Sequence, residues 1–244
     1  MALKLRNLVP PLSLCFVLLF PFSVNAQWEY NWLIGLSGGF IDRDGSLDLA
    51  IFHQAGELTT LTIEQEDSGF FAGLFAGYQA RCNKWLVGAE IKVDWQDLGN
   101  DRDTAFTDAL GNGIALSSRY RQTNIVELSG RLGYEVYNAV MPYARLGFQT
   151  SRDRLTVSAA DPSIGAAEID DQHRVYRLLT GVGVEMPIPV LMGLSFRMEY
   201  NYLPKGGRID GQSLAPDNVT VGTANIRPHL HQTFLALVLN LFEI

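Results

Sequence analysis

The stretch WLVGAEIKVDWQ, residues 85–96, alternates between two kinds of side chain. Its odd-numbered positions are apolar from Trp85 to Trp95, whereas Glu90, Lys92 and Asp94 at even-numbered positions are charged. A β-strand points successive side chains to opposite faces, so this period of two predicts a strand with one apolar and one charged face. The stretch is also long enough for a tilted strand to cross a bilayer, which takes about 10 residues.

Seven further segments of similar length alternate in the same way, at residues 31–41, 69–80, 123–136, 141–151, 175–186, 192–203 and 230–242. Their apolar faces carry no charge. The charged side chains all fall on the opposite faces: Glu90, Lys92, Asp94, Glu127, Arg131, Glu135, Arg145, Arg177, Glu185, Arg197 and Glu199. A soluble β-sandwich also has two unlike faces, so alternation alone leaves a sandwich and a membrane barrel open.

The connections between these segments favour the barrel. Short links at about 81–84, 137–140 and 187–191 alternate with long polar segments at about 42–68, 97–122, 152–174 and 204–229. Outer-membrane barrels alternate tight periplasmic turns with long extracellular loops in this way, whereas four long structureless loops are unusual in a soluble domain. We therefore predict an all-β fold, an eight-stranded antiparallel up-and-down transmembrane β-barrel with four long extracellular loops.

Aromatic residues mark the ends of the predicted strands. Trp32, Tyr78, Trp85 and Tyr134 lie next to the short turns, and Phe40, Phe70, Trp95, Tyr176, Tyr200 and Tyr202 lie next to the long loops. Aromatic rings favour both membrane interfaces, so these residues predict two girdles. An even number of strands brings both termini to the short-turn side, which is the periplasmic side of such a barrel.

The first 26 residues are typical of a secretory signal peptide. Lys4 and Arg6 precede an apolar stretch that ends in Val24-Asn25-Ala26, which suits cleavage before Gln27. An uncleaved anchor is the alternative, but prolines interrupt the stretch and it is short for a membrane span. No later segment approaches 18 apolar residues, which argues against a helical membrane protein. We expect residues 27–244 to form the barrel domain in the outer membrane.

Charge and cysteine content exclude several function classes. The formal net charge is −7 and no basic cluster is present, which argues against nucleic-acid binding. Cys15 lies in the predicted signal peptide, so Cys82 remains as a single thiol that forms neither an internal disulfide nor a cysteine metal site. We expect no cofactor.

Several short motifs are similar to those of one family when they are taken in order along the chain. They are Gly77-Tyr78 with Gly88-Ala89-Glu90, Gly130-Arg131-Leu132-Gly133-Tyr134 with Met141-Pro142-Tyr143, Gly181-Val182-Gly183-Val184-Glu185, and Arg197-Met198-Glu199-Tyr200-Asn201-Tyr202. The whole mature chain resembles the opacity-type surface proteins, which share their fold with the membrane domain of outer-membrane protein A. One departure is the ending Leu241-Phe242-Glu243-Ile244, because such barrels usually end in Phe.

The interior of an eight-stranded barrel is just wide enough to be filled by side chains. Small residues line one sector, at Gly35, Ser37, Gly39, Gly73 and Gly77. Long charged side chains from the other strands are therefore expected to reach across and pair, because an isolated buried charge is costly. We interpret the charged set as a structural lumenal network, with a narrow ion path as the alternative.

These features predict a non-enzymatic surface protein, structural or adhesin-like, that binds through its extracellular loops. A small porin is the alternative, and a lipid-modifying enzyme is a third possibility because His229 and His231 share a face with Thr233. The expected partners are outer-membrane lipid and lipopolysaccharide, the barrel-assembly machinery during biogenesis, and host or cell-surface ligands at the loops.

Three smaller motifs lie in the predicted loops. His173 with Asp170-Asp171 are candidates to join the two later histidines in a surface metal site, although spacing across loops does not decide this. Asp42-Arg43-Asp44-Gly45 is interpreted as a turn rather than a calcium loop. Gly111-Asn112-Gly113 predicts a hairpin that extends above the membrane. No residue is assigned to catalysis or to metal or cofactor binding.

Overall fold

The computed structural model describes residues 28–52, 58–96, 98, 101–107, 113–137, 140–161, 165–207, 209–214 and 221–242. This part of the chain holds eleven β-strands: β1 (Trp28–Phe52), β2 (Leu58–Cys82), β3 (Trp85–Gln96), β4 (Asp101–Thr107), β5 (Gly113–Tyr134), β6 (Met141–Asp161), β7 (Gly165–Pro187), β8 (Leu194–Leu203), β9 (Ile209–Leu214), β10 (Val221–Ile226) and β11 (His229–Phe242). No helix within the described ranges is long and apolar enough to cross a membrane. The predicted signal peptide lies outside the described residues.

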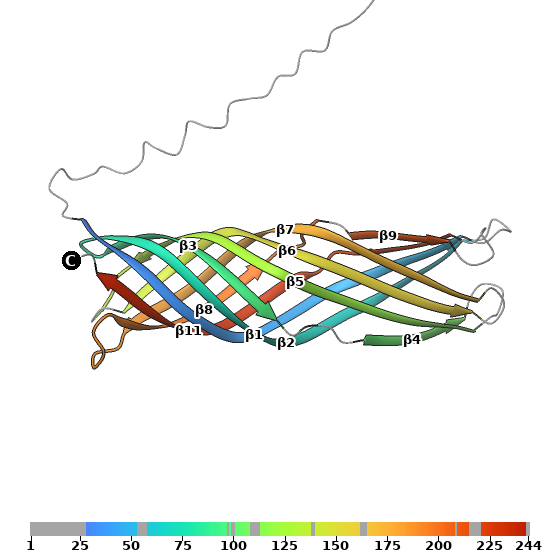
Figure 1. Ribbon diagram of the computed structural model, residues 1–244, viewed down its shortest axis with the longest axis horizontal. Helices are drawn as coiled ribbons and strands as arrows, with labels where there is room; N and C mark the ends of the chain where they lie inside the picture. Colours follow the sequence, from blue (N-terminus) through green and yellow to red (C-terminus); the bar gives the residue numbers. More distant parts are fainter. Residues whose placement is uncertain are drawn as a thin grey trace, which may run out of the picture.

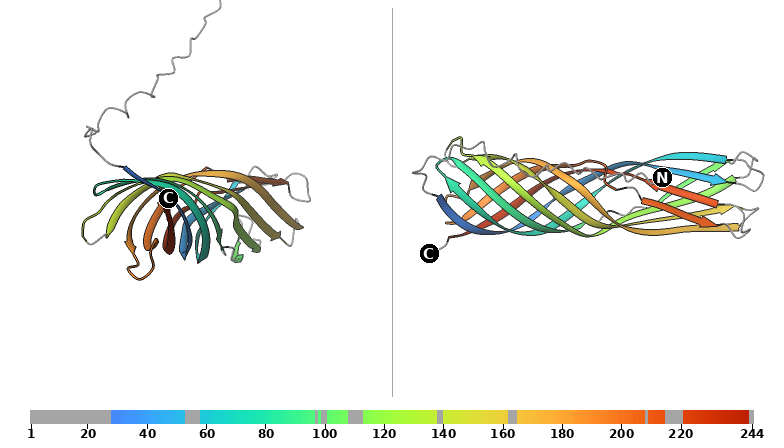
Figure 2. Two further views of the ribbon diagram at one scale, coloured as in Figure 1. Left: turned by 60° about the vertical axis from the view of Figure 1, so that its left-hand side comes forward. Right: turned by 90° about the horizontal axis from the view of Figure 1, so that it is seen from above.

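Eight of these strands close into a ring (Figure 1). The order is β1, β2, β3, β5, β6, β7, β8 and β11, every neighbouring pair is antiparallel, and β11 returns to pair with β1 from Asp44↔His229 to Asn31↔Phe242. The strands wind obliquely around the long axis in each view (Figure 2). The predicted eight-stranded up-and-down barrel is therefore confirmed.

The short connections lie together at one end of the barrel. Asn83 and Lys84 form the two-residue turn between β2 and β3, where Asn83 adopts a φ of 54°, as expected for the twist of a tight hairpin. Tyr137 bridges Val140 between β5 and β6, and residues 188–193 connect β7 to β8. The start of β1 and the end of β11 lie at this same end (Figure 1).

The four segments predicted as loops are mostly strands, and that prediction was wrong. The strands β1, β2, β5, β6 and β7 run for 21 to 25 residues, which is twice what a bilayer needs. Strand β4 pairs with β5, while β9 pairs with β10, which continues along β1. The β4–β5 pairing confirms the hairpin predicted in residues 97–122. The four hairpin ends lie outside the described residues.

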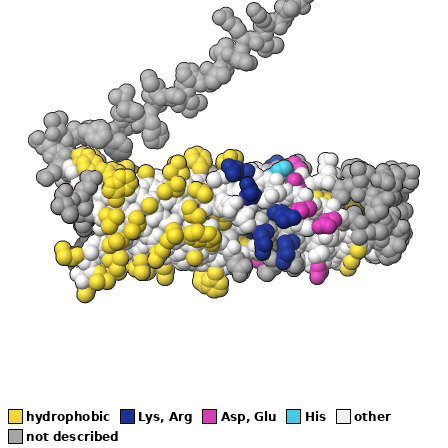
Figure 3. All heavy atoms as spheres, in the orientation of Figure 1, with side chains coloured by type: hydrophobic (Ala, Val, Ile, Leu, Met, Phe, Trp, Pro, Cys, Tyr) yellow, Lys and Arg dark blue, Asp and Glu magenta, His cyan; other side chains and the backbone are white. Residues whose placement is uncertain are grey.

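The barrel has two halves with opposite polarity (Figure 3). In the half nearer the short turns, which we call the membrane segment, apolar side chains face outward, and the charged ones face inward beside a smaller apolar cluster that includes Leu33, Phe71, Phe75 and Phe234. In the other half, which we call the extension, the outer wall is polar and the interior is an apolar cluster. This cluster contains Leu47, Leu49, Ile63, Leu116, Tyr120, Leu155, Val157, Ile169, Val175, Ile209, Ala224 and Ile226. The first half suits lipid and the second suits water.

A β-bulge in β5 lies at the junction of the two halves. Pairing with β6 shifts between Thr123 and Val126, and Asn124 has a φ of 51°. One extra residue reverses which positions face inward, so that Gln122 and Ile125 both point into the barrel. A strict period of two across residues 113–134 would have turned one half of β5 inside out.

Candidate functional site

The lumen of the membrane segment holds the predicted charged residues. Ten of the eleven are buried there: Glu90, Lys92, Asp94, Glu127, Arg131, Arg145, Arg177, Glu185, Arg197 and Glu199. Glu135 differs, because it is half-buried beyond the end of β5, where its backbone N–H donates to the carbonyl of Lys84. The structure therefore places Glu135 at the short-turn end and not within the lumen of the membrane segment.

Two arginines and two glutamates form the ion cluster nearest the short turns. Arg197 donates to both carboxylate oxygens of Glu90 at 3.0 Å and to Glu185 at 3.1 Å. Arg131 lies 2.6 Å from Glu185 and 3.1 Å from Glu90. Two positive and two negative charges thus balance in a place where water cannot screen them, which is the condition for keeping ions buried.

A second cluster has one arginine between two carboxylates. The Arg145 guanidinium lies 3.3 Å from Glu127 and also donates to Glu199. Neutral donors supply further hydrogen bonds to the two carboxylates: Tyr143 Oη donates to Glu199 at 2.5 Å, and Gln149 Nε2 donates to Glu127 at 3.0 Å. Arg145 is therefore the cation that both of these buried carboxylates contact.

A third layer combines an ion pair with aromatic rings. Lys92 Nζ lies 3.0 Å from Asp94 and sits over the rings of Phe71 and Phe234, at 4.7 and 4.2 Å from their centroids. The neighbouring position on β2 must be small to leave this room, because Gly73 pairs in register with Asp94. A Cβ on Gly73 would come within 2.0 Å of Asp94 Oδ1 and 3.0 Å of Lys92 Cε, so this ion pair fills the space that the missing side chain leaves.

The layer above was not predicted, apart from Arg177. Arg177 lies 2.6 Å from Asp153, Tyr120 Oη also donates to Asp153, and Arg43 lies 2.8 Å from Asp67. Burial lowers the pKa of the Arg43 guanidinium, and it raises the pKa of Tyr120, which the nearby Asp153 carboxylate raises further. These residues were assigned to loops, although the alternation that continues through Ile41, Arg43 and Leu47 was the signal for them.

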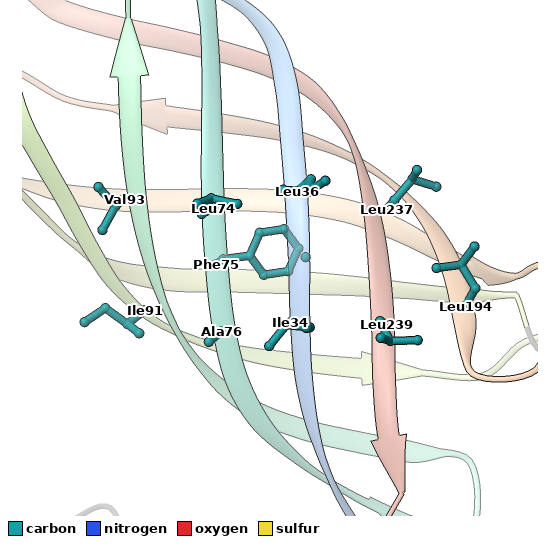
Figure 4. A pocket seen from close by; sticks show the side chains of 11 residues that line it. Ile34, Leu36, Leu74, Phe75, Ala76, Ile91, Val93, Leu194, Leu237 and Leu239 are labelled. Carbon is teal, nitrogen blue, oxygen red and sulfur yellow. The ribbon is translucent and has the colours of Figure 1, made fainter.

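Apart from Tyr120, the apolar cluster of the extension lies above this layer, so buried side chains point into the described interior at every level. A hollow of about 690 Å³ lies on the outer wall instead, lined by Ile34, Leu36, Leu74, Ile91, Val93, Leu237 and their neighbours. Figure 4 shows these side chains on β1, β2, β3 and β11, with Leu194 from β8. Because the hollow is apolar and belongs to the lipid-facing band, it suits acyl chains rather than a polar ligand.

All ten predicted girdle residues are exposed on the outer wall of the membrane segment. Pairs of them are in contact across strands: Trp85 packs edge-on against Tyr134 with 4.9 Å between ring centroids, and Phe40 lies 4.4 Å from Phe70. Large exposed aromatic rings in two bands are unfavourable in water and favourable at the two bilayer interfaces.

Five arginines lie on the outer wall just above the upper girdle, over β5, β6 and β7. This arginine patch consists of Arg119, Arg121, Arg152, Arg154 and Arg174. The register sets Arg121 opposite Arg154 and Arg152 opposite Arg174. Figure 3 shows a band of basic side chains beside the hydrophobic band. Arg154 is already paired with Asp170, so the repulsion that favours an anionic partner lies between Arg152 and Arg174, which are directly opposite each other.

The predicted grouping of histidines is corrected by the structure. His173 and Asp170-Asp171 lie on β7, where His173 Nε2 is 2.9 Å from Asp171, whereas His229 and His231 lie on β11 beside Asp44. The motif Asp42-Arg43-Asp44-Gly45 continues β1 and is not a turn. Cys82 is buried at the end of β2.

One family model matches this chain, and several solved structures are similar to it. A family model described as an outer membrane protein beta-barrel domain matches residues 12–226. Similar solved structures include the Escherichia coli outer membrane protease OmpT (10% identity, 86% of this chain and 96% of that one, TM-score 0.44) and Pseudomonas aeruginosa OprG (14%, 86% and 96%, 0.48). Another is Ail, the attachment invasion locus protein of Yersinia pestis (12%, 84% and 98%, 0.30). None of the curated proteins matches the chain in sequence.

Proposed function

Because the chain belongs to the outer membrane protein β-barrel family, we propose that it is a non-enzymatic, adhesin-like surface protein that binds through the outer ends of its hairpins. Membership of this family implies a location in the outer membrane. The observation that carries the proposal is the interior of the barrel, where ion clusters and a small apolar cluster occupy one half and an apolar core occupies the other. A barrel with such an interior is suited to act as a rigid support for its outer ends, and not as a channel.

The extension supports display at a distance from the membrane. Strand β1 continues from Phe40 in the upper girdle to Phe52 and stays paired with β2 throughout. At about 3.3 Å per residue and a tilt of about 40°, this run places Phe52 roughly 30 Å above the girdle. The apolar core holds the hairpins in fixed relative positions, which reduces the entropy lost when a partner binds across several ends.

The proposed orientation has both termini in the periplasm. It is supported by the short turns, which share one end with the start of β1 and the end of β11, and by the long hairpins at the other end. During biogenesis the barrel-assembly machinery would handle the chain from the periplasmic side, where β11 has to close on β1. The long, polar hairpins then face the outside.

The arginine patch is the part of the wall best suited to lipopolysaccharide. Arg174 lies two residues from Tyr176 of the upper girdle on the same face of β7, which corresponds to the level of the phosphorylated headgroups. Arginine matches phosphate with two parallel hydrogen bonds, and several arginines together bind better than one. Lipid phosphates would also relieve the repulsion between Arg152 and Arg174.

Replacing Arg152 and Arg174 together by glutamate is expected to weaken lipopolysaccharide binding at least tenfold and to remove the rise in unfolding temperature that lipopolysaccharide gives the wild type. Binding is measured on the refolded barrel with lipid A and with its dephosphorylated form. Lys84→Glu, an exposed charge change in the short turn between β2 and β3 at the other end of the barrel, is the control. Equal binding of both lipid forms by the wild type would contradict the assignment.

A closed interior also predicts that the barrel does not conduct ions. The purified protein in planar bilayers is expected to give no steady single-channel current, and Arg131→Ala is expected to lower the unfolding temperature without opening a path, because the layers of Phe71, Phe234 and the apolar cluster remain. A large porin serves as the positive control. Reproducible conductance steps from the wild type would contradict the closed interior and favour the small porin as the function.

A further inference from the structure

Three potential metal ligands meet on the outer wall where the barrel closes. Asp44 of β1 is opposite His229 of β11, and His231 follows two residues later on the same face. One ligand atom from each lies within 4.8 Å of the other two. We call this group the closure cluster. It lies just above the upper girdle, with Phe40 on the same face of β1 and Tyr202 opposite His231 on β8.

The two imidazoles are already oriented toward a common point. His229 Nε2 lies 3.4 Å from Asp44 Oδ2, and the ring centroids of His229 and His231 are 5.4 Å apart. Tyr200 Oη is hydrogen-bonded to His231 Nδ1 at 2.6 Å, which leaves Nε2 of that ring for a ligand. A partner on the second ring nitrogen is the usual way in which a protein fixes a metal-binding histidine.

A polar hollow of about 550 Å³ adjoins the cluster and gives access to it. It is lined by Asp42, Asp44, Glu66, Asp67, Ser68 and His231. Asp67 is already paired with Arg43, but Asp42, Asp44 and Glu66 also line the hollow, so it attracts cations and raises their local concentration. Asp42 also pairs in register with His231, which places a second carboxylate next to the cluster.

We propose that the closure cluster binds a divalent transition metal of the zinc class, with two imidazole nitrogens and one carboxylate oxygen as ligands. Imidazole suits zinc, nickel and copper, whereas calcium and magnesium prefer oxygen ligands only. Three protein ligands leave the fourth tetrahedral position open toward the hollow, for water or for an anionic group from outside. The metal joins the first strand to the last one and so fastens the seam of the barrel.

The test uses untagged barrel refolded in detergent and stripped with a chelator. Zinc binding is measured by calorimetry, and cobalt is used as a spectroscopic probe, because tetrahedral cobalt with nitrogen ligands gives an intense visible band. His229→Ala and His231→Ala are expected to weaken zinc binding roughly 100-fold or more and to abolish that band. Tyr200→Phe, which removes the positioning partner of His231, is expected to weaken it roughly tenfold.

His173→Ala is the matched control, because His173 is also an exposed histidine beside a carboxylate but lacks a third ligand among the described residues. Heat-modifiable migration on gels establishes that each variant is folded. Zinc should also raise the unfolding temperature of the wild type and of His173→Ala, but not of His229→Ala. The proposal is overturned if His173→Ala loses as much affinity as His231→Ala, or if calcium and magnesium bind as tightly as zinc.

Discussion

Replacing Arg145 by methionine is expected to lower the free energy of unfolding by about 3–5 kcal/mol, the cost of removing one partner from a buried ion pair. Arg145 is 4% exposed and lies between Glu127 and Glu199, which are both fully buried. Methionine fills much of the same volume, so the loss comes from two carboxylates left without their cation. Urea-induced unfolding in lipid vesicles, followed by tryptophan fluorescence, measures the change.

Two further variants separate charge from packing. Arg154→Met makes the same substitution on the same strand, but its ion pair with Asp170 is largely exposed, so solvent screening leaves little to lose. The triple variant Arg145→Met, Glu127→Gln, Glu199→Gln also removes the two carboxylate charges that Arg145→Met leaves unpaired. It is expected to recover most of the lost free energy of unfolding. The interpretation fails if Arg145→Met unfolds at the same urea concentration as Arg154→Met.

The membrane segment was predictable from the sequence because lipid imposes one rule on every strand. Outward positions have to be apolar, and the charges on the other face have to pair inside. In β11 this rule selected the correct leucine face, from Leu235 to Leu241, and these residues are exposed on the outer wall. The aromatic residues follow from the same rule, since both interfaces are fixed by the thickness of the bilayer.

The extension was not predicted because the two faces of the strands exchange their polarity outside the membrane. In residues 42–49 of β1 the outward positions are Asp42, Asp44 and Asp48, while the inward positions become Leu47 and Leu49. Such a segment has the composition of a polar loop although its period is still two. The bulge at Asn124 also switches the inward-facing positions of β5 from even to odd numbers, and amino-acid composition does not predict where such a switch occurs.

The pairing within the sites could not be predicted, because it depends on closure. Arg145 and Glu199 are 54 residues apart and lie on strands that are not neighbours, so they meet only across the lumen. Asp44 meets His229 only because the last strand pairs with the first in one particular register. Alternation says which side a residue faces, but the register of the closed ring says what it faces.

Leu155→Ala is expected to loosen the extension and leave the membrane segment intact. Leu155 is fully buried in the apolar cluster, so its truncation should cost the extension about 2–5 kcal/mol. The membrane segment has its own ion clusters and its lipid contacts, and these do not involve Leu155. We therefore expect amide hydrogen exchange to accelerate in residues 152–161 of β6, while residues 141–150 of the same strand keep the wild-type rate.

Thr156→Ala is the control for this experiment, because Thr156 is the next residue of β6 and points toward the outer wall. It should leave exchange unchanged in both halves of the strand. Faster exchange along the whole of β6 in Leu155→Ala would mean that the barrel is a single cooperative unit. Faster exchange in residues 152–161 alone would mean that the membrane segment and the extension unfold independently, although they share the same strands. The layer of Arg43, Tyr120, Asp153 and Arg177 would then be the boundary between these two units.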